Sequence, residues 1–107
     1  MITQVGSSAI REMIEQGTTF LVEVSAGWCH PCRILEKFLF PLSNEFPEFP
    51  FYKVDYDANT DIFEILEIGT VPYIVIFREG KAAVRIRGLT SENSIREALS
   101  EILKNSL

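Results

Sequence analysis

The sequence predicts an α/β fold in which helices cover both faces of a mixed β-sheet. Apolar runs of strand length alternate with amphipathic segments in the first half of the chain, as in parallel βαβ units. Two further strand-like segments, 73–78 and 81–87, are joined by Glu79-Gly80, a two-residue hairpin signal. With a closing amphipathic segment, the order is (β)αβαβαββα, which gives a sheet of four or five strands.

The N-terminal segments supply the first three elements of this order. Residues 2–5 are expected to form a short outer strand, and Ser7 or Ser8 to cap a helix that Gly17 ends. Residues 18–25 are apolar on both faces with one exception. This pattern is typical of a central parallel strand that is buried on both sides.

The second helix is expected to begin near Cys29, with Pro31 in its first turn, where a missing N–H costs nothing. Its apolar residues recur at helical spacing, and Pro47 with Pro50 should end it. The next strand covers residues 51–56.

The remaining elements are marked by caps and by alternation. Asn59 or Thr60 should cap a short helix that Gly69 terminates, and Ser91 should cap the last helix. In the segment 81–87, apolar residues alternate with arginines, which predicts an edge strand protected by charge.

Length and composition set the class of protein. The 107 residues are expected to form one domain (1–107) that acts as a monomer. A net charge of −5 without a basic run argues against nucleic acid, and no apolar stretch is long enough to span a membrane. Because residues 1–17 do not resemble a signal peptide, we expect a cytoplasmic protein; a periplasmic one is the alternative if an export signal has been removed.

The most informative motif is Cys29-His30-Pro31-Cys32, which holds both cysteines and the only histidine. In a reducing cytosol such a pair favours catalysis or metal binding over a structural disulfide. At a helix N-terminus, unpaired N–H groups should lower the pKa of the Cys29 thiol. Cys29 is therefore the predicted nucleophile, and Cys32, one turn further in, is the predicted resolving thiol.

Two structural alternatives remain for this motif. A zinc site needs four ligands, whereas the chain offers two thiols and one imidazole between them, so two chains would have to share it. The other alternative is a passive structural disulfide. We expect neither, and we expect no metal.

The chain resembles the thioredoxin family along its whole length. Trp28-Cys29-His30-Pro31-Cys32 is similar to the W-C-G-P-C motif of that family, with histidine in place of glycine. Further matching positions are Lys53, Asp55 and Asp57, which resemble the third-strand segment of the family, and Thr70-Val71-Pro72, Gly80 and Gly88. The resemblance implies a thioredoxin fold and a protein-disulfide reductase.

The resemblance also implies roles for individual residues. Pro72 would be a cis-proline, and the backbone of Val71 would pair with an extended substrate. Trp28, Val71 and Gly88 would belong to an apolar docking surface, next to His30. The enzyme would need no cofactor beyond the Cys29–Cys32 disulfide, and a partner reductase or oxidant would regenerate it.

Glu23 interrupts the buried strand, where an ionised carboxylate is costly unless it is paired. It falls where thioredoxins usually carry a buried aspartate, so the resemblance implies a proton relay to the resolving Cys32. Burial should raise the pKa of Glu23, whereas Lys53 on the adjoining strand should oppose that shift. The alternative is a structural carboxyl bonded to Lys53 or water.

His30 bears on the direction of electron flow. Positive charge beside Cys29 stabilises the reduced form, so we expect a potential above the value of about −270 mV for thioredoxin. Two rival functions remain open: an oxidase- or isomerase-like protein of an oxidising compartment, and a partner-binding module whose cysteines are incidental.

Overall fold

The computed structural model describes residues 1–105. Its centre is a five-stranded mixed sheet with the strand order β1-β3-β2-β4-β5. The strands are β1 (Ile2–Gln4), β2 (Phe20–Ser25), β3 (Phe51–Asp55), β4 (Tyr73–Arg78) and β5 (Lys81–Arg87). β1, β3 and β2 are parallel to one another, whereas β4 and β5 run antiparallel to their neighbours.

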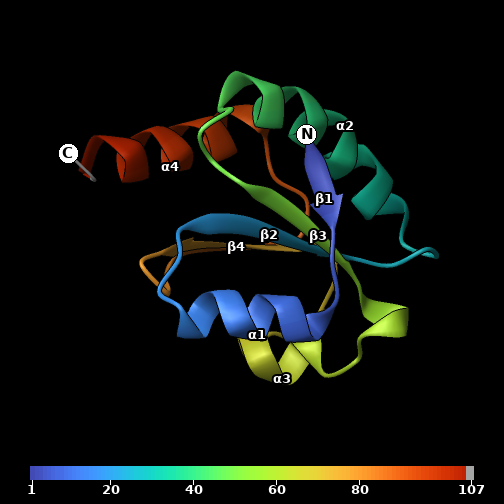
Figure 1. The fold of residues 1–107 in the computed structure, drawn as a ribbon. Helices are drawn as coiled ribbons and strands as arrows, with labels where there is room; N and C mark the ends of the chain where they lie inside the picture. The colour runs from blue at the N-terminus through green and yellow to red at the C-terminus, as the bar shows by residue number, and fades with distance from the viewer. Residues whose placement is uncertain (106–107) are drawn as a thin grey trace.

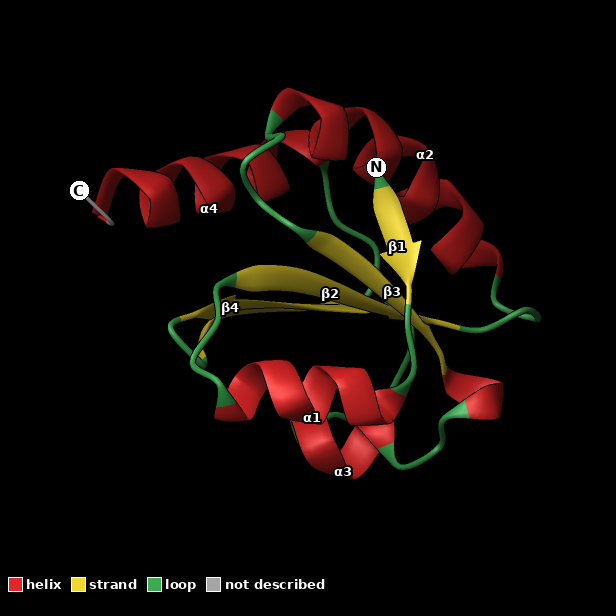
Figure 2. Cartoon of the chain, in the orientation of Figure 1, coloured by secondary structure: helices red, strands yellow, loops and turns green. Residues whose placement is uncertain are grey.

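Helices cover both faces of the sheet, as predicted (Figures 1 and 2). They are α1 (Ser7–Glu15), α2 (His30–Glu45), α3 (Ile62–Leu66) and α4 (Glu92–Asn105), with a short 3₁₀ turn at Tyr56–Ala58. In Figure 1, α2 and α4 lie above the sheet, and α1 and α3 lie below it. None of the helices within residues 1–105 is long and apolar enough to cross a membrane.

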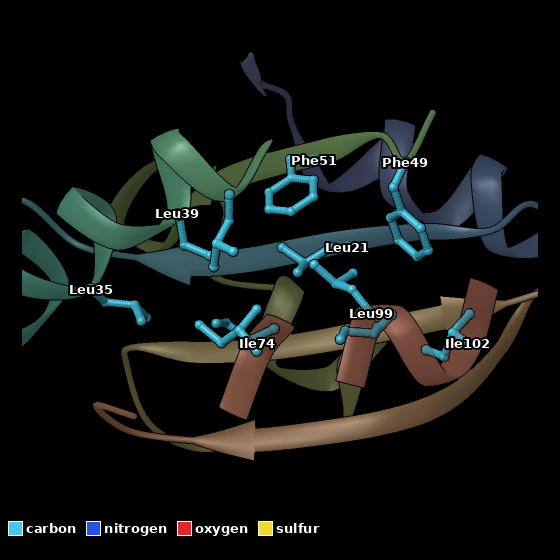
Figure 3. Packing of buried hydrophobic residues seen from close by; sticks show 11 residues of the cluster. Leu21, Leu35, Leu39, Phe49, Phe51, Ile74, Leu99 and Ile102 are labelled. Carbon is cyan, nitrogen blue, oxygen red and sulfur yellow. The ribbon is translucent and has the colours of Figure 1, made fainter. Parts of the chain in front are cut away.

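Alternation along β2 divides the core between the two faces. Leu21 packs with α2 and α4 in one cluster, while its neighbours Phe20 and Val22 pack with α1 and α3 in the other. Figure 3 shows the first cluster, in which Leu21 and Phe51 from the sheet meet Leu39 of α2 and Leu99 of α4. Glu23, two residues beyond Leu21, is therefore directed to the α2 side.

The helix caps correct two of our predictions. The N-cap of α1 is Gly6, and Ser7 lies inside the helix, where its backbone N–H donates to Asn59 Oδ1 at 3.0 Å. Neither Asn59 nor Thr60 caps α3; its N-cap is Asp61. The side chain of Asn59, which is distant in the sequence, thus accepts the hydrogen bond from the first turn of α1. No local sequence pattern indicates this contact.

Helix ends differ from the predictions in a similar way. α3 ends at Leu66, and its C-cap is not Gly69 but Glu67, which itself adopts a left-handed conformation (φ 59°). The cap of α4 is as predicted, since Ser91 Oγ accepts from the N–H of Ser94 at 3.1 Å. In the β4–β5 hairpin, Glu79 and Gly80 both have positive φ, the geometry that the hairpin signal predicts.

Candidate active site

The two cysteines lie at the junction of β2 and α2. Cys29 is the N-cap of α2 and forms a disulfide with Cys32, with a Cα–Cα separation of 5.3 Å. The Cys29 sulfur accepts a hydrogen bond from the backbone N–H of Cys32 at 3.3 Å. Cys29 is 4% exposed and Cys32 is fully buried. The helix therefore directs a backbone donor, and its positive end, at the outer sulfur.

The residues that pack beside the disulfide come from other parts of the chain. Ala26 packs with the cysteines, and Val71 and Tyr56 pack against this small cluster. The Val71–Pro72 peptide bond is cis, and the carbonyl of Pro72 accepts from the N–H of Gly88 at 2.9 Å. Residues far apart in the sequence thus meet around the sulfur atoms.

The residues on either side of Cys29 in the chain are exposed. Trp28 is 69% exposed, and its indole N–H donates to Asp57 Oδ1 at 3.2 Å. His30 and Pro31 occupy the first turn of α2 and are exposed. An exposed indole and an exposed imidazole therefore flank Cys29.

Glu23 lies on β2 and is 1% exposed. Neither of its carboxylate oxygens makes a close hydrogen bond to a described residue. Burial, followed by the negative charge of nearby Glu36, raises the pKa of Glu23 from its ordinary 4.5 to about 8. Lys53 and Arg33 oppose this rise but do not reverse it. The buried carboxyl is therefore mostly protonated at neutral pH.

Lys53 is opposite Glu23 in the β2–β3 register, but its ammonium does not pair with Glu23. Lys53 Nζ instead contacts Glu36 Oε2 at 3.2 Å. The same oxygen accepts from Ser25 Oγ at 2.7 Å, and Glu36 Oε1 contacts Arg33 Nη1 at 3.0 Å. Glu36 therefore pairs with Lys53, which the sequence placed near Glu23, and also with Arg33.

Glu36, Arg33 and Ser25 are the residues that our sequence analysis missed. One signal was available: Glu36 follows Cys32 by four positions, so it lies on the same helical face, toward the buried strand. Burial opposes the ionisation of Glu36, but the hydrogen bond from Ser25 and the charge of Lys53 outweigh it and lower its pKa. Glu36 is therefore the ionised partner of the two carboxyls.

Within residues 1–105 no group of three or more histidine, cysteine, aspartate or glutamate side chains is placed to hold a metal ion. The chemistry that the described residues do support is thiol–disulfide exchange. An outer sulfur faces helix N–H groups, an inner sulfur lies one turn away, and a protonated carboxyl is buried on the same side of the sheet.

Comparison with known proteins agrees with this chemistry. The thioredoxin family model matches residues 2–101. The chain is 30% identical to a thioredoxin H-type of Fagopyrum esculentum, over 78% of this chain and 72% of that one. It is 28% identical to thioredoxin-1 of Saccharomyces cerevisiae, over 94% of this chain and 97% of the relative.

Solved structures show the same likeness. The crystal structure of thioredoxin from Trypanosoma brucei brucei superposes with a TM-score of 0.87 at 27% identity, covering 97% of this chain and 92% of that one. Together with the Cys29–Cys32 disulfide, these matches show a thiol–disulfide oxidoreductase with protein-disulfide reductase activity. The chain belongs to the thioredoxin family.

Proposed function

We propose that Cys29 is the attacking thiol and Cys32 the resolving thiol in the reduction of protein disulfides. The single observation that carries this assignment is the hydrogen bond from the Cys32 N–H to the Cys29 sulfur at the start of α2. In the reduced enzyme, the same donor and the positive helix end favour a thiolate at Cys29. Cys32 is fully buried, so it is reached only from within the protein.

The exchange proceeds in two displacements. The Cys29 thiolate attacks one sulfur of the target disulfide, a mixed disulfide forms, and the second target sulfur leaves as a thiolate. Glu23 releases its own proton to solvent, its carboxylate then accepts the proton of the Cys32 thiol, and the Cys32 thiolate attacks the Cys29 sulfur. The Cys29–Cys32 disulfide forms, the first target sulfur leaves as a thiolate, and the target has gained two electrons. Both target thiolates take up protons from solvent.

A target segment docks beside Val71 in extended form. Within residues 1–105 no backbone hydrogen bond engages Val71, so its N–H and C=O can pair with such a segment. Trp28 and His30, the chain neighbours of Cys29, are exposed, and the N–H of Gly88 donates to the carbonyl of Pro72. These residues form the proposed docking surface.

The oxidised enzyme is returned to the dithiol by a partner reductase, as in the thioredoxin family. We further propose a single-domain monomer that works in the cytoplasm without a metal or organic cofactor. A reducing compartment suits a catalytic C-x-x-C pair.

Insulin reduction driven by dithiothreitol tests the assignment with a matched pair of variants. Cys29→Ser should abolish the reaction and trap no target. Cys32→Ser should also lose turnover, but it should accumulate a mixed disulfide through Cys29 that mass spectrometry detects. Trapping by Cys29→Ser instead would reverse the two roles, and full activity of either variant would overturn the mechanism.

A further inference from the structure

The charged groups around Glu23 come from two elements. α2 contributes Glu36 and Arg33, and β3 contributes Lys53. On the other side, β4 places the apolar Ile74 opposite Glu23. The charge state of Glu23 therefore depends on how Glu36, Arg33 and Lys53 pair among themselves.

Glu36 holds both cations at the same time. Its two oxygens contact Arg33 Nη1 at 3.0 Å and Lys53 Nζ at 3.2 Å, and Ser25 Oγ fixes the second oxygen at 2.7 Å. Without Glu36, Lys53 would face the Glu23 carboxyl from the adjacent position of the sheet, because the two residues are register partners.

We infer that Glu36 is a positioning residue for the proposed disulfide exchange: it binds Lys53 and Arg33, keeps their charge away from the Glu23 carboxyl, and so leaves Glu23 holding a proton in the resting enzyme. The inference rests on the proposed function, in which Glu23 exchanges a proton with Cys32. Glu36 acts through Glu23 and has no direct part in the sulfur chemistry.

A cleft gives this arrangement access to solvent. It has a volume of about 220 Å³ and is lined by Ile2, Gln4, Glu23, Glu36, Phe40 and Lys53. Glu23 is its most deeply buried member, whereas the side chains of Glu36 and Lys53 are 22% and 28% exposed. The Glu36–Lys53 ion pair therefore lines the same cleft as the Glu23 side chain.

The substitution Glu36→Gln removes a negative charge from beside Glu23 and releases Lys53 toward it. Both changes favour the ionised form of Glu23. The amide oxygen of glutamine still accepts the hydrogen bond from Ser25, so the local packing is retained. Glu45→Gln is the matched control, since Glu45 lies on the same helix but pairs with Arg96, away from the cysteines.

The test is a ¹³C NMR titration of the Glu23 side-chain carboxyl in the oxidised protein, where the cysteines do not titrate. Glu36→Gln should move the Glu23 midpoint down by about one pH unit or more, as expected for a nearby cation that becomes available. Glu45→Gln should leave it in place. A Glu23 midpoint unchanged by Glu36→Gln would overturn the inference.

The substitution Lys53→Met provides a second, independent test by the same titration of Glu23. In the wild-type background it should raise the Glu23 midpoint only slightly, because Glu36 already holds the ammonium. In the Glu36→Gln background the rise should be larger, and this non-additivity is the signature of a shared partner. Equal effects in both backgrounds would show that Glu36 does not control Lys53 and would contradict the inference.

A pH profile of insulin reduction separates this inference from the proposed function. The acid limb of the rate should move in Glu36→Gln by the same interval as the NMR midpoint. If the midpoint moves but the rate profile does not, the relay role of Glu23 fails while the control of Glu23 by Glu36 stands. If Glu36→Gln lowers the midpoint of the unfolding transition but leaves the titration midpoint of Glu23 unchanged, the role of Glu36 is purely structural and the inference is wrong.

Discussion

The buried Glu23 carboxyl should make the protein less stable as pH rises, and Glu23→Gln should remove that dependence. The folded chain raises the pKa of Glu23 from 4.5 to about 8 through burial and the charge of Glu36. Well below pH 4.5 the residue is protonated in both states, so its titration does not change the free energy of unfolding. As pH rises, the unfolded chain releases this proton while the folded chain keeps it, so unfolding becomes more favourable.

The size of the effect follows from the pKa in the two states. Each pH unit between the two values is worth about 1.4 kcal/mol at most. Because titration is incomplete at both ends of the range, the free energy of unfolding should fall by about 3.5 kcal/mol between about pH 5 and pH 8. The decline should level off above the folded pKa of about 8, where both states are ionised. A neutral glutamine cannot contribute such a slope.

Urea unfolding of the oxidised protein at several pH values measures this difference. The wild type should lose stability relative to Glu23→Gln as pH rises, whatever the absolute cost of burying the amide. Glu101→Gln on the exposed side of α4 is the control and should follow the wild type. Parallel curves for the wild type and Glu23→Gln would refute a protonated, buried Glu23.

Three further predictions concern positions away from Glu23. His30→Gly should lower the redox potential, measured against a glutathione buffer, because it removes the imidazole next to the attacking sulfur, which favours the dithiol; an unchanged or higher value would contradict this. Gly80→Ala should lower the free energy of unfolding, measured with urea, by about 1 to 3 kcal/mol. The reason is that φ is +79° at this position and a Cβ atom would lie 2.7 Å from a backbone oxygen of α1. A variant as stable as the wild type would exclude that strain. Ser7→Ala should lower the free energy of unfolding by about 1 to 2 kcal/mol, because it removes the 2.6 Å hydrogen bond from Ser7 to Asp61. The control Ser8→Ala, at an exposed position, should leave the stability unchanged. Equal effects of the two substitutions would show that the bond contributes nothing.

The elements of the fold could be predicted where the signal is local. β2 is uniformly buried, α2 carries a continuous apolar face, and the hairpin at Glu79-Gly80 has its own turn chemistry. The helix caps could not be predicted in the same way. The acceptor for the first turn of α1 is Asn59, which lies 52 residues from the N–H that it accepts.

The same distinction applies to the site. The disulfide of Cys29 and Cys32 and the burial of Glu23 follow from spacing and from one carboxylate within an apolar strand. The ion-pair partner of Lys53 could not be predicted in this way. The strand register places Lys53 beside Glu23, but its ammonium contacts Glu36 on α2. The pairing of Lys53 with Glu36 depends on how closely α2 packs over the sheet, and the periodicity of the sequence does not determine that distance.

The most direct test of the account is the pH dependence of iodoacetamide alkylation at Cys29, measured in Cys32→Ser so that one thiol reacts. The hydrogen-bond donor and the helix end at this sulfur predict a rate midpoint well below the pKa of about 8.5 of an ordinary cysteine thiol. A midpoint at or above that value would contradict the claim that the start of α2 activates Cys29.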